Sequence, residues 1–314
     1  MLEKSILLIG GNGFLGSNIM NWIDDHFTNY KVSTINRTLR RKDEQKFECL
    51  GHEFVGDFTD EQFLKEIFSN YSFDYVFHCL STSIPATSNH NIIADVQTNL
   101  IATINLLDLL KDKKSTLIFF SSGGAIYGNS SSTVHKVGDN PYPISSYGVI
   151  KNSIEQYIHI YHRLYELQYL ILRISNPYGP YHKSNVQGVI NIAIRKAIAK
   201  EVIEVWGTGE NLKDYIFSQD IPEIIFALLA NNIVNSTINL GSGEGNSINS
   251  ILNIINEFDP GLEIKYIEQK KHDVAEFVLD IVELKGLIDI TLTPLKEGIL
   301  KTYTWQKSNL IAGF

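Results

Sequence analysis

The chain of 314 residues is poor in cysteine, with only Cys49 and Cys79 and no Cys-x-x-Cys pair. This usage argues against a disulfide framework, so a reducing cytoplasm is the simplest expectation. Basic blocks are also absent, because 27 Lys and Arg stand against 35 Asp and Glu, a formal net charge of −8. The charge balance disfavours nucleic acid and anionic membranes as main partners, although it does not exclude an anionic small ligand.

Long hydrophobic runs, internal repeats and low-complexity linkers are missing as well. The first apolar run, residues 4–9, is too short for a signal peptide or a membrane span. His78 lies in an apolar stretch with no second ligand at metal-binding spacing, so we expect a core histidine and no metal site. The length and an apolar content of 44% predict one large or two closely joined globular domains.

Three spaced glycines, Gly10, Gly13 and Gly16, follow this first run, and an amphipathic helical pattern begins at Phe14. Gly10 permits a tight turn, Gly13 lets the backbone approach a pyrophosphate, and Gly16 lets the helix pack close to the strand. The free N–H groups and the positive end of the helix then face the phosphates. A glycine turn in some other α/β unit is the alternative, but the strand and helix around it favour a dinucleotide site.

The end of the next predicted strand, residues 30–35, bears on the choice of cofactor. An NAD-specific site usually has Asp or Glu there, which accepts hydrogen bonds from the ribose hydroxyls. This chain has Asn36 and Arg37 instead. The amide can still bond a hydroxyl, and the guanidinium can pair with a 2′-phosphate. A solvated basic loop is the alternative interpretation, so NAD and NADP both stay open.

Polar residues also follow the later predicted strands, at the ends where open α/β sheets bind their ligands. Asp57 is placed to bond an adenine, and Phe58 to flank its ring. The loop 80–85 and the pair Ser121-Ser122 are strand ends of the same kind. Asn99 lies one residue away from the buried stripe of a long predicted helix.

Tyr147 and Lys151 are four residues apart in a helix predicted over 146–165, so they share one face. A phenol near an ammonium has its phenolate favoured, and we therefore expect a lowered pKa of Tyr147. Such a tyrosine can exchange a proton with a sugar hydroxyl near neutral pH. A surface pair one helical turn apart is the alternative, but the glycine turn and the serine strand end favour catalysis.

These residues are part of a longer series of motifs. The series is Gly10-x-x-Gly13-x-x-Gly16, Gly56-Asp57, Asn99, Ser121-Ser122 before Tyr127-Gly128, Tyr147-x-x-x-Lys151, Arg173-x-x-Asn176-Pro177-x-Gly179, Trp206-Gly-x-Gly209, Asp214-Tyr215 and Asn239-x-Gly-x-Gly243. Over nearly its whole length the chain resembles the extended short-chain dehydrogenases/reductases. Within them it resembles the NAD-dependent nucleotide-sugar epimerase/dehydratase family, near the UDP-glucose 4-epimerases.

The resemblance implies an α/β fold, a Rossmann-type doubly wound parallel sheet with a smaller C-terminal α/β substrate-binding lobe. Residues 1–174 would form the NAD(P)-binding domain and residues 175–314 the nucleotide-sugar region, with the chain crossing between the lobes. It also implies tightly bound NAD, which removes hydride from C4 of the sugar and returns it to the other face. Tyr147 would take the O4 proton, a Ser or Thr would bond the same oxygen, and Lys151 would orient the cofactor.

The same resemblance assigns side chains to the two ligands. Cofactor contacts are expected from Gly10, Gly13, Phe14, Leu15, Gly16, Asn36, Arg37, Asp57, Phe58, Leu80, Ser81, Thr82, Asn99, Ser121, Tyr147, Lys151 and Pro177. Substrate contacts are expected from Ser122, Gly123, Tyr147, Asn176, Gln187, Val189, Lys213, Tyr215 and Lys270. Asn176 would hold the nucleotide end, and Pro177 would pack near the nicotinamide.

Three positions depart from the family pattern. The usual Ser or Thr position falls on Gly123, so we assign the helper hydroxyl to Ser122. Lys213 stands where the family often has an arginine that grips the diphosphate, and Lys270 or Lys271 occupies a second basic position. Lysine keeps the charge but lacks the bidentate fork. The third departure is the acid missing after the second strand.

The residues before Tyr127 distinguish among the relatives. Family 4,6-dehydratases carry an Asp-Glu pair there and sugar-acid decarboxylases a Glu, whereas this chain has Gly124 and Ala125. Elimination favours a 4-epimerase, and the resemblance implies UDP-glucose and UDP-galactose or their N-acetyl forms as its substrates. An NADPH-dependent 4-keto-sugar reductase and a catalytically silent nucleotide-binding member are the alternatives. By analogy, helices near 92–111 and 146–165 would pair with their copies in a homodimer, and polysaccharide synthesis would be the pathway.

Overall fold

The computed structural model describes residues 3–26, 29–41, 45–128, 132–268 and 276–311. Its main sheet has seven parallel strands in the order β11-β7-β5-β4-β1-β2-β3. They are β1 (Lys4–Ile9), β2 (Tyr30–Asn36), β3 (Leu50–Val55), β4 (Tyr75–His78), β5 (Thr116–Ser122), β7 (Gln168–Ile174) and β11 (Ser236–Leu240). This is the doubly wound parallel sheet that the sequence predicts. The strand order reverses between β1 and β4, which is where such sheets bind ligands.

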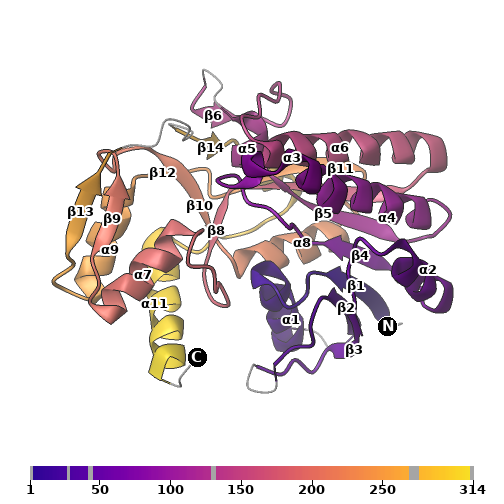
Figure 1. Cartoon of the computed structure of the whole chain (residues 1–314), viewed down its shortest axis with the longest axis horizontal. Coiled ribbons are helices and arrows are strands. Elements are labelled where there is room, and N and C mark those ends of the chain that lie inside the picture. Colours follow the sequence, from indigo (N-terminus) through magenta and orange to yellow (C-terminus); the bar gives the residue numbers. More distant parts are fainter. Residues whose placement is uncertain (1–2, 27–28, 42–44, 129–131, 269–275, 312–314) are drawn as a thin grey trace.

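Helices cover both faces of this sheet, because its strands are apolar on both sides. Ile6 and Leu8 of β1 pack into one core cluster, and Leu7 and Ile9 pack into the other. One face carries α1 (Phe14–His26), α8 (Asp220–Ala230) and α10 (Val282–Leu287). The other carries α2 (Glu61–Asn70), α3 (Ile92–Asp95), α4 (Ala102–Leu110) and α6 (Ser146–Tyr165) (Figure 1).

The long helix predicted over 92–111 is one continuous run with a π-helical segment, η2 (Val96–Ile101), between α3 and α4. By length and composition alone, the run Ile92–Leu110 could cross a membrane. Core helices of soluble proteins pass the same test, and Leu106, Leu107 and Leu110 are fully buried against the sheet. The run is therefore weak evidence for a membrane span.

The smaller lobe is built mostly from the C-terminal half and has its own core cluster. Its strands are β8 (Asn176–Tyr178), β9 (Ile203–Trp206), β10 (Lys213–Phe217), β12 (Gly245–Asn246) and β13 (Ile264–Ile267). Its helices are α7 (Val189–Ala199), α9 (Ile248–Phe258) and α11 (Leu295–Ile311). Two short strands, β6 (Val134–His135) and β14 (Val278–Leu279), pair between the lobes. The chain crosses between the lobes, since α8 and β11 return to the main sheet (Figure 1).

Candidate active site

A cavity of about 260 Å³ lies at the carboxyl ends of β1 and β4, where the strand order reverses. Its walls are Gly10, Gly13, Phe14, Leu15, Gly16, Cys79, Ser81, Ser83, Ile84, Tyr147 and Gln187. A small cavity of about 10 Å³ between β4 and α6 is lined by His78, Leu80, Ser81, Ser83, Asn99, Thr103, Tyr147, Ile150, Lys151 and Ile154. Tyr147 borders both spaces, so the fold brings the glycine turn and the predicted catalytic tyrosine to one site.

The glycine turn has the shape of a phosphate cradle. Gly10 adopts φ +87°, a conformation that L side chains rarely adopt. A Cβ on Gly16 would lie 2.6 Å from the carbonyl oxygen of Gly11, and one on Gly13 would lie 3.0 Å from that of Gly10. Because α1 begins at Phe14, its N-terminal N–H groups open onto this turn. Backbone close to the cavity and a helix N-terminus suit the pyrophosphate of a dinucleotide.

Asn36 sits at the end of β2 and holds the glycine turn. Its Oδ1 accepts a hydrogen bond of 2.8 Å from the backbone N–H of Asn12. Arg37 lies beside it, with Nε 3.7 Å from the Asp57 carboxylate at the end of β3. Hydrogen bonds from Thr59 hold the pKa of Asp57 below its usual value. Asn36 therefore contacts the glycine turn, and Arg37 and Asp57 pair next to it, on the side where the adenosine part of a cofactor is expected.

Phe58 corrects one expectation. Its side chain is only 4% exposed and packs edge-on against His78, with ring centroids 5.1 Å apart. The ring belongs to the core and packs against His78, so it is not the exposed ring beside an adenine that the sequence suggested. His78 is itself buried, and burial lowers its pKa to about 3, which keeps it a neutral core residue as expected.

The loop after β4 is fastened to the π-helical segment. Asn99 accepts a 2.9 Å hydrogen bond from the Thr82 N–H and donates a 2.7 Å bond to the Thr82 hydroxyl. Leu80 and Ser81 of the same loop line the cavities. Asn99 thus acts on the predicted cofactor wall through the loop.

Lys151 lies one turn after Tyr147 on α6, inside the site. Its ammonium donates a 2.7 Å hydrogen bond to the carbonyl of Phe120 and lies 5.7 Å from the centroid of the Tyr147 ring. Burial lowers the pKa of Lys151 to about 8. The two side chains share a face as predicted, but the ammonium is directed at the backbone of β5.

The pKa of Tyr147 differs from the sequence expectation. Burial raises it to about 12, the Asp95 carboxylate adds to the rise, and a hydrogen bond with Ser122 opposes both. The expected lowering by Lys151 is therefore wrong for the protein alone, because desolvation of a phenolate outweighs an ammonium that points elsewhere.

Ser122 and Gly123 differ in the room around them. Ser122 is the N-cap of a short helix, α5 (Gly123–Tyr127), and its hydroxyl also bonds the side chain of Tyr147. A Cβ on Gly123 would lie 2.8 Å from the side chain of Leu279 and 3.0 Å from that of Phe277. The position where the family usually has a hydroxyl is thus closed by β14 and the residue before it.

Ser121 is turned away from the cavity. It is 5% exposed, and its hydroxyl donates a 2.5 Å hydrogen bond to the buried carboxylate of Glu155. Arg173 of β7 forms an ion pair with the same carboxylate at 2.7 Å. The expected contact between the Ser121 side chain and the cofactor is corrected to a structural one beneath the site.

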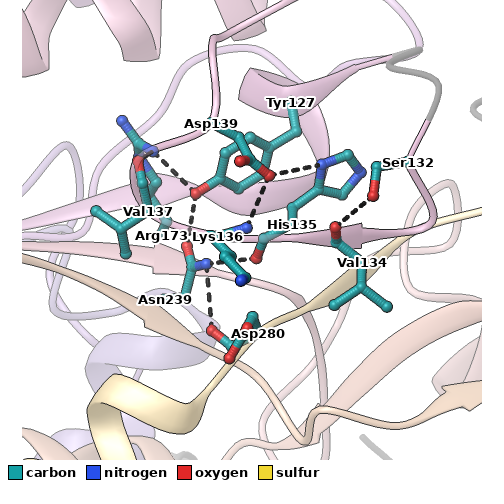
Figure 2. A network of polar contacts seen from close by, with 10 residues as sticks. All are labelled: Tyr127, Ser132, Val134, His135, Lys136, Val137, Asp139, Arg173, Asn239 and Asp280. Carbon is teal, nitrogen blue, oxygen red and sulfur yellow. Dashed lines mark hydrogen bonds and ion pairs between the residues drawn. The ribbon is translucent and has the colours of Figure 1, made fainter.

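The motif residues Tyr127, Arg173 and Asn239 form a buried polar network (Figure 2). Arg173 donates to the Tyr127 hydroxyl at 2.9 Å, and that hydroxyl donates to Asn239 Oδ1 at 2.8 Å. Asn239 then donates to the carbonyl of His135, whose ring stacks on Tyr127 with centroids 4.8 Å apart. These residues tie α5, β7, β11 and β6 together, so their role here is to hold the strand ends.

The predicted substrate residues have different surroundings in the structure. Gln187 lines the large cavity with Tyr147, and the exposed side chain of Val189 stands at the start of α7. Asn176 donates a 2.8 Å hydrogen bond to the carbonyl of Asp214. The expected substrate contact of Tyr215 is corrected, because its side chain is 6% exposed and lies in the core of the smaller lobe.

The other predicted positions have simple placements. Pro177 and Lys213 are partly buried in β8 and β10, respectively. Lys270 and Lys271 lie outside the described residues. Sequence reasoning missed Asp95, whose buried carboxylate contacts three segments around Tyr147. Its only signal was its position four residues before Asn99, on the same helical face.

Comparison with known proteins gives the site its context. Residues 6–241 match the model of the NAD dependent epimerase/dehydratase family. A putative UDP-glucose 4-epimerase of Methanocaldococcus jannaschii is 31% identical over 308 residues, 97% of this chain and 99% of the relative. A UDP-glucuronate 4-epimerase of Thermodesulfobacterium geofontis is 28% identical, over 97% of this chain and 91% of its own.

Two solved structures are similar over almost the whole chain. The UDP-glucose 4-epimerase of Thermotoga maritima with UDP-glucose has a TM-score of 0.85 at 27% identity, covering 98% of this chain and 99% of that one. The UDP-N-acetylglucosamine 4-epimerase of Methanobrevibacter ruminantium, with UDP-N-acetylmuramic acid, has a TM-score of 0.87 at 27% identity, covering 98% and 100%. With its glycine turn, Tyr147 and Lys151 in one site, the chain belongs to the NAD dependent epimerase/dehydratase family.

Proposed function

We propose that the chain is a nucleotide-sugar 4-epimerase that works with tightly bound NAD. The observation that carries the proposal is a cavity that extends from the glycine turn to Tyr147, beside which Ser122 lies. Gly124 and Ala125 offer no carboxyl group for dehydration or decarboxylation. A proton acceptor, a helper hydroxyl and a dinucleotide cradle suffice for reversible oxidation at one sugar carbon.

The chemistry divides between Tyr147 and Ser122. The phenolate of Tyr147 takes the O4 proton while C4 loses hydride, so the C4–H and O4–H bonds break and a 4-keto sugar forms. When bound, NAD supplies the hydride acceptor and a positive charge that favours the phenolate of Tyr147. Ser122 would bond the same sugar oxygen, and Lys151 would hold the nicotinamide ribose when the cofactor is bound. After the ketone turns its other face, the hydride returns to C4 while Tyr147 returns the proton to O4, so no net oxidation results.

The substrate we propose is UDP-glucose with UDP-galactose, or the N-acetyl forms of this pair. The proposal is supported by the similarity to the Thermotoga maritima and Methanobrevibacter ruminantium epimerases, whose structures hold UDP-glucose and UDP-N-acetylmuramic acid. Gln187, Asn176 and Lys213 would contact the nucleotide sugar from the smaller lobe.

The experiment uses the purified protein without added cofactor. One portion is denatured and the released dinucleotide is identified by mass. The other is incubated separately with UDP-glucose, UDP-N-acetylglucosamine and their C4 epimers. Release of NAD together with interconversion of one pair supports the proposal and names the sugar. Turnover that appears only when NADPH is added to a keto sugar contradicts it.

Turnover that requires added NADPH would favour a 4-keto-sugar reductase, and one observation supports this alternative. Asn36 replaces the usual acid, and Arg37 is the next residue, where its guanidinium pairs with Asp57. A guanidinium there can pair with the 2′-phosphate of NADPH. A dTDP-4-dehydro-6-deoxyglucose reductase of Escherichia coli is 28% identical over 258 residues, 81% of each chain.

We also propose that the protein is a homodimer. The helical run 92–110 and α6 lie side by side on one face of the sheet (Figure 1). Their outer sides expose apolar residues, of which Ile93 is 73% exposed and Leu164 63%. Ile101, Val149 and Tyr157 continue this apolar stripe. A second copy of the same pair of helices would cover it.

A further inference from the structure

Asp95, the last residue of α3, is a buried acid beside the active site that the proposed chemistry does not use. It is 4% exposed, and its carboxylate accepts three hydrogen bonds from side chains. Ser83 and Asn99 donate to Oδ1 at 2.6 and 2.8 Å, and Ser146 donates to Oδ2 at 2.7 Å. A buried charge with all these donors is an ordered feature of the fold, because leaving it unpaired would be costly.

The three donors come from three different segments beside the active site. Ser83 belongs to the loop after β4 that lines the large cavity. Asn99 lies in the π-helical segment and holds the same loop through Thr82. Ser146 is the first residue of α6, directly before Tyr147. Asp95 therefore joins the cofactor wall of the cavity to the helix that carries the proposed proton acceptor.

Other bonds fix the first turn of α6 at the same point. The N–H groups of Ser146 and Tyr147 donate to the side chains of Asn89 and Ser88, at 2.8 and 3.1 Å. The Gly148 N–H donates to the capping hydroxyl of Ser145 at 3.2 Å. With its first-turn N–H groups held from outside the helix and its first side chain held by Asp95, α6 has a fixed start. Small displacements of the reacting groups slow a reaction strongly, so a fixed position of Tyr147 at the start of α6 favours a high rate.

We propose that Asp95 is a positioning residue for the reaction, which fixes Tyr147 relative to the loop 80–85 at the cofactor side of the cavity. The proposal rests on the function proposed above for Tyr147. Asp95 is not itself among the residues that line the cavities; it acts on them through its hydrogen bonds with Ser83 and Ser146.

The charge of Asp95 has a separate, measurable effect. Asp95 from α3 and Lys151 from α6 face Tyr147, Ser122 bonds it from β5, and His78 and Cys79 of the β4 end adjoin Lys151. The carboxylate raises the pKa of Tyr147, because a negative neighbour disfavours the phenolate. Removing the charge therefore lowers this pKa, and a purely structural role would leave it where it is.

Two variants distinguish the effect of the hydrogen bonds of Asp95 from the effect of its negative charge. Ser146→Ala removes the link to α6 and keeps the carboxylate; we expect kcat to fall about tenfold with little change in KM for the sugar. Asp95→Asn keeps the size and most of the bonds; we expect the acid limb of the rate profile to move to lower pH. Asp112→Asn, at an exposed acid after α4, is the matched control and should leave both unchanged.

A second readout does not depend on the sugar. The phenolate of Tyr147 is titrated in the holoenzyme by ultraviolet absorbance, as the difference from Tyr147→Phe, with and without Asp95→Asn. A midpoint that moves to lower pH supports the proposal, even if wild-type protein epimerises none of the sugars and the proposed function fails. The opposite result has two parts: the midpoint does not move in Asp95→Asn, and Ser146→Ala keeps the wild-type kcat. In protein that epimerises its sugar, this result would overturn the role of Asp95 and leave the proposed function standing.

Discussion

At the scale of single residues, the pKa of Tyr147 is set by opposing neighbours. Burial and Asp95 raise it, whereas the hydrogen bond from Ser122 lowers it. The phenolate is the form that accepts the O4 proton, so activity is lost as the pH falls through this pKa in the holoenzyme. Each neighbour can therefore be tested by the direction in which the acid limb of the rate profile moves.

Ser122→Ala should move the acid limb to higher pH, opposite to Asp95→Asn. Loss of the hydroxyl removes a bond that favours the phenolate, so the pKa of Tyr147 rises. Loss of a positioned hydroxyl should also lower kcat by about tenfold or more. Ser122→Thr keeps the hydroxyl and is the control. A profile for the alanine variant that superimposes on wild type would assign the helper role elsewhere.

Gly123→Ala should destabilise the protein by about 1–3 kcal/mol, the usual cost of overpacking a core. The added methyl would lie 2.8 Å from Leu279 and 3.0 Å from Phe277. At Gly124 the nearest side-chain atom would be 3.5 Å away, an ordinary contact, so Gly124→Ala is the matched control in α5. The measurement is the free energy of unfolding in denaturant for Gly123→Ala and Gly124→Ala. Equal stabilities of the two variants would show that β14 does not close the position of Gly123.

At the scale of elements, the ends of β5, β7 and β11 are held together by buried polar contacts. Glu155 pairs with Arg173 and bonds Ser121 of β5, and Arg173 continues through Tyr127 to Asn239 of β11 (Figure 2). Arg173→Met should cost about 3–5 kcal/mol of unfolding free energy, because it leaves the carboxylate of Glu155 buried and unpaired. Lys65→Met, in an exposed pair with Glu61, should cost less than about 1 kcal/mol. A similar small loss in both variants would mean that the network does not hold the strand ends.

Most elements could be predicted from the sequence, because their signals are local. The helix at 146–165 was predicted at its observed bounds, and the first strand and the start of its helix agree with the prediction as well. The helices α2, α5 and α8 were not predicted, and the last two lie in stretches interrupted by glycine or proline. The π-helical turn around Asn99 has no sequence period that distinguishes it from an α-helix.

The sequence predicted which residues meet at the site better than it predicted what their side chains contact. Tyr147 and the glycine turn do share a cavity, since motifs at strand ends meet in a parallel sheet. Ser121, Phe58 and Tyr215 belong to the right elements, yet their side chains face the core. Orientation at a strand end depends on which partners are buried nearby, and Glu155 or His78 cannot be known from spacing alone.

At the scale of the whole molecule, the proposed dimer makes a concentration-dependent prediction. Leu164→Lys places a charge in the exposed apolar stripe of α6 and should yield monomers, because a buried unpaired charge would oppose association. Sedimentation of wild type and variant over a range of concentrations is the measurement. Lys196→Ala in the smaller lobe is a control that should not alter the wild-type state. A wild-type protein that sediments as a monomer throughout would contradict the proposed homodimer.

The central claim is that hydride leaves C4 and returns to the same carbon within one active site, with Tyr147 moving the O4 proton. The most direct measurement uses the UDP-sugar that the protein interconverts, labelled with deuterium at C4, and follows the label in the product. The account predicts that deuterium stays at C4, that solvent hydrogen does not enter there, and that Tyr147→Phe releases the same dinucleotide yet converts at least about 100-fold more slowly. Exchange of the C4 label with solvent, or normal turnover in Tyr147→Phe, would contradict it.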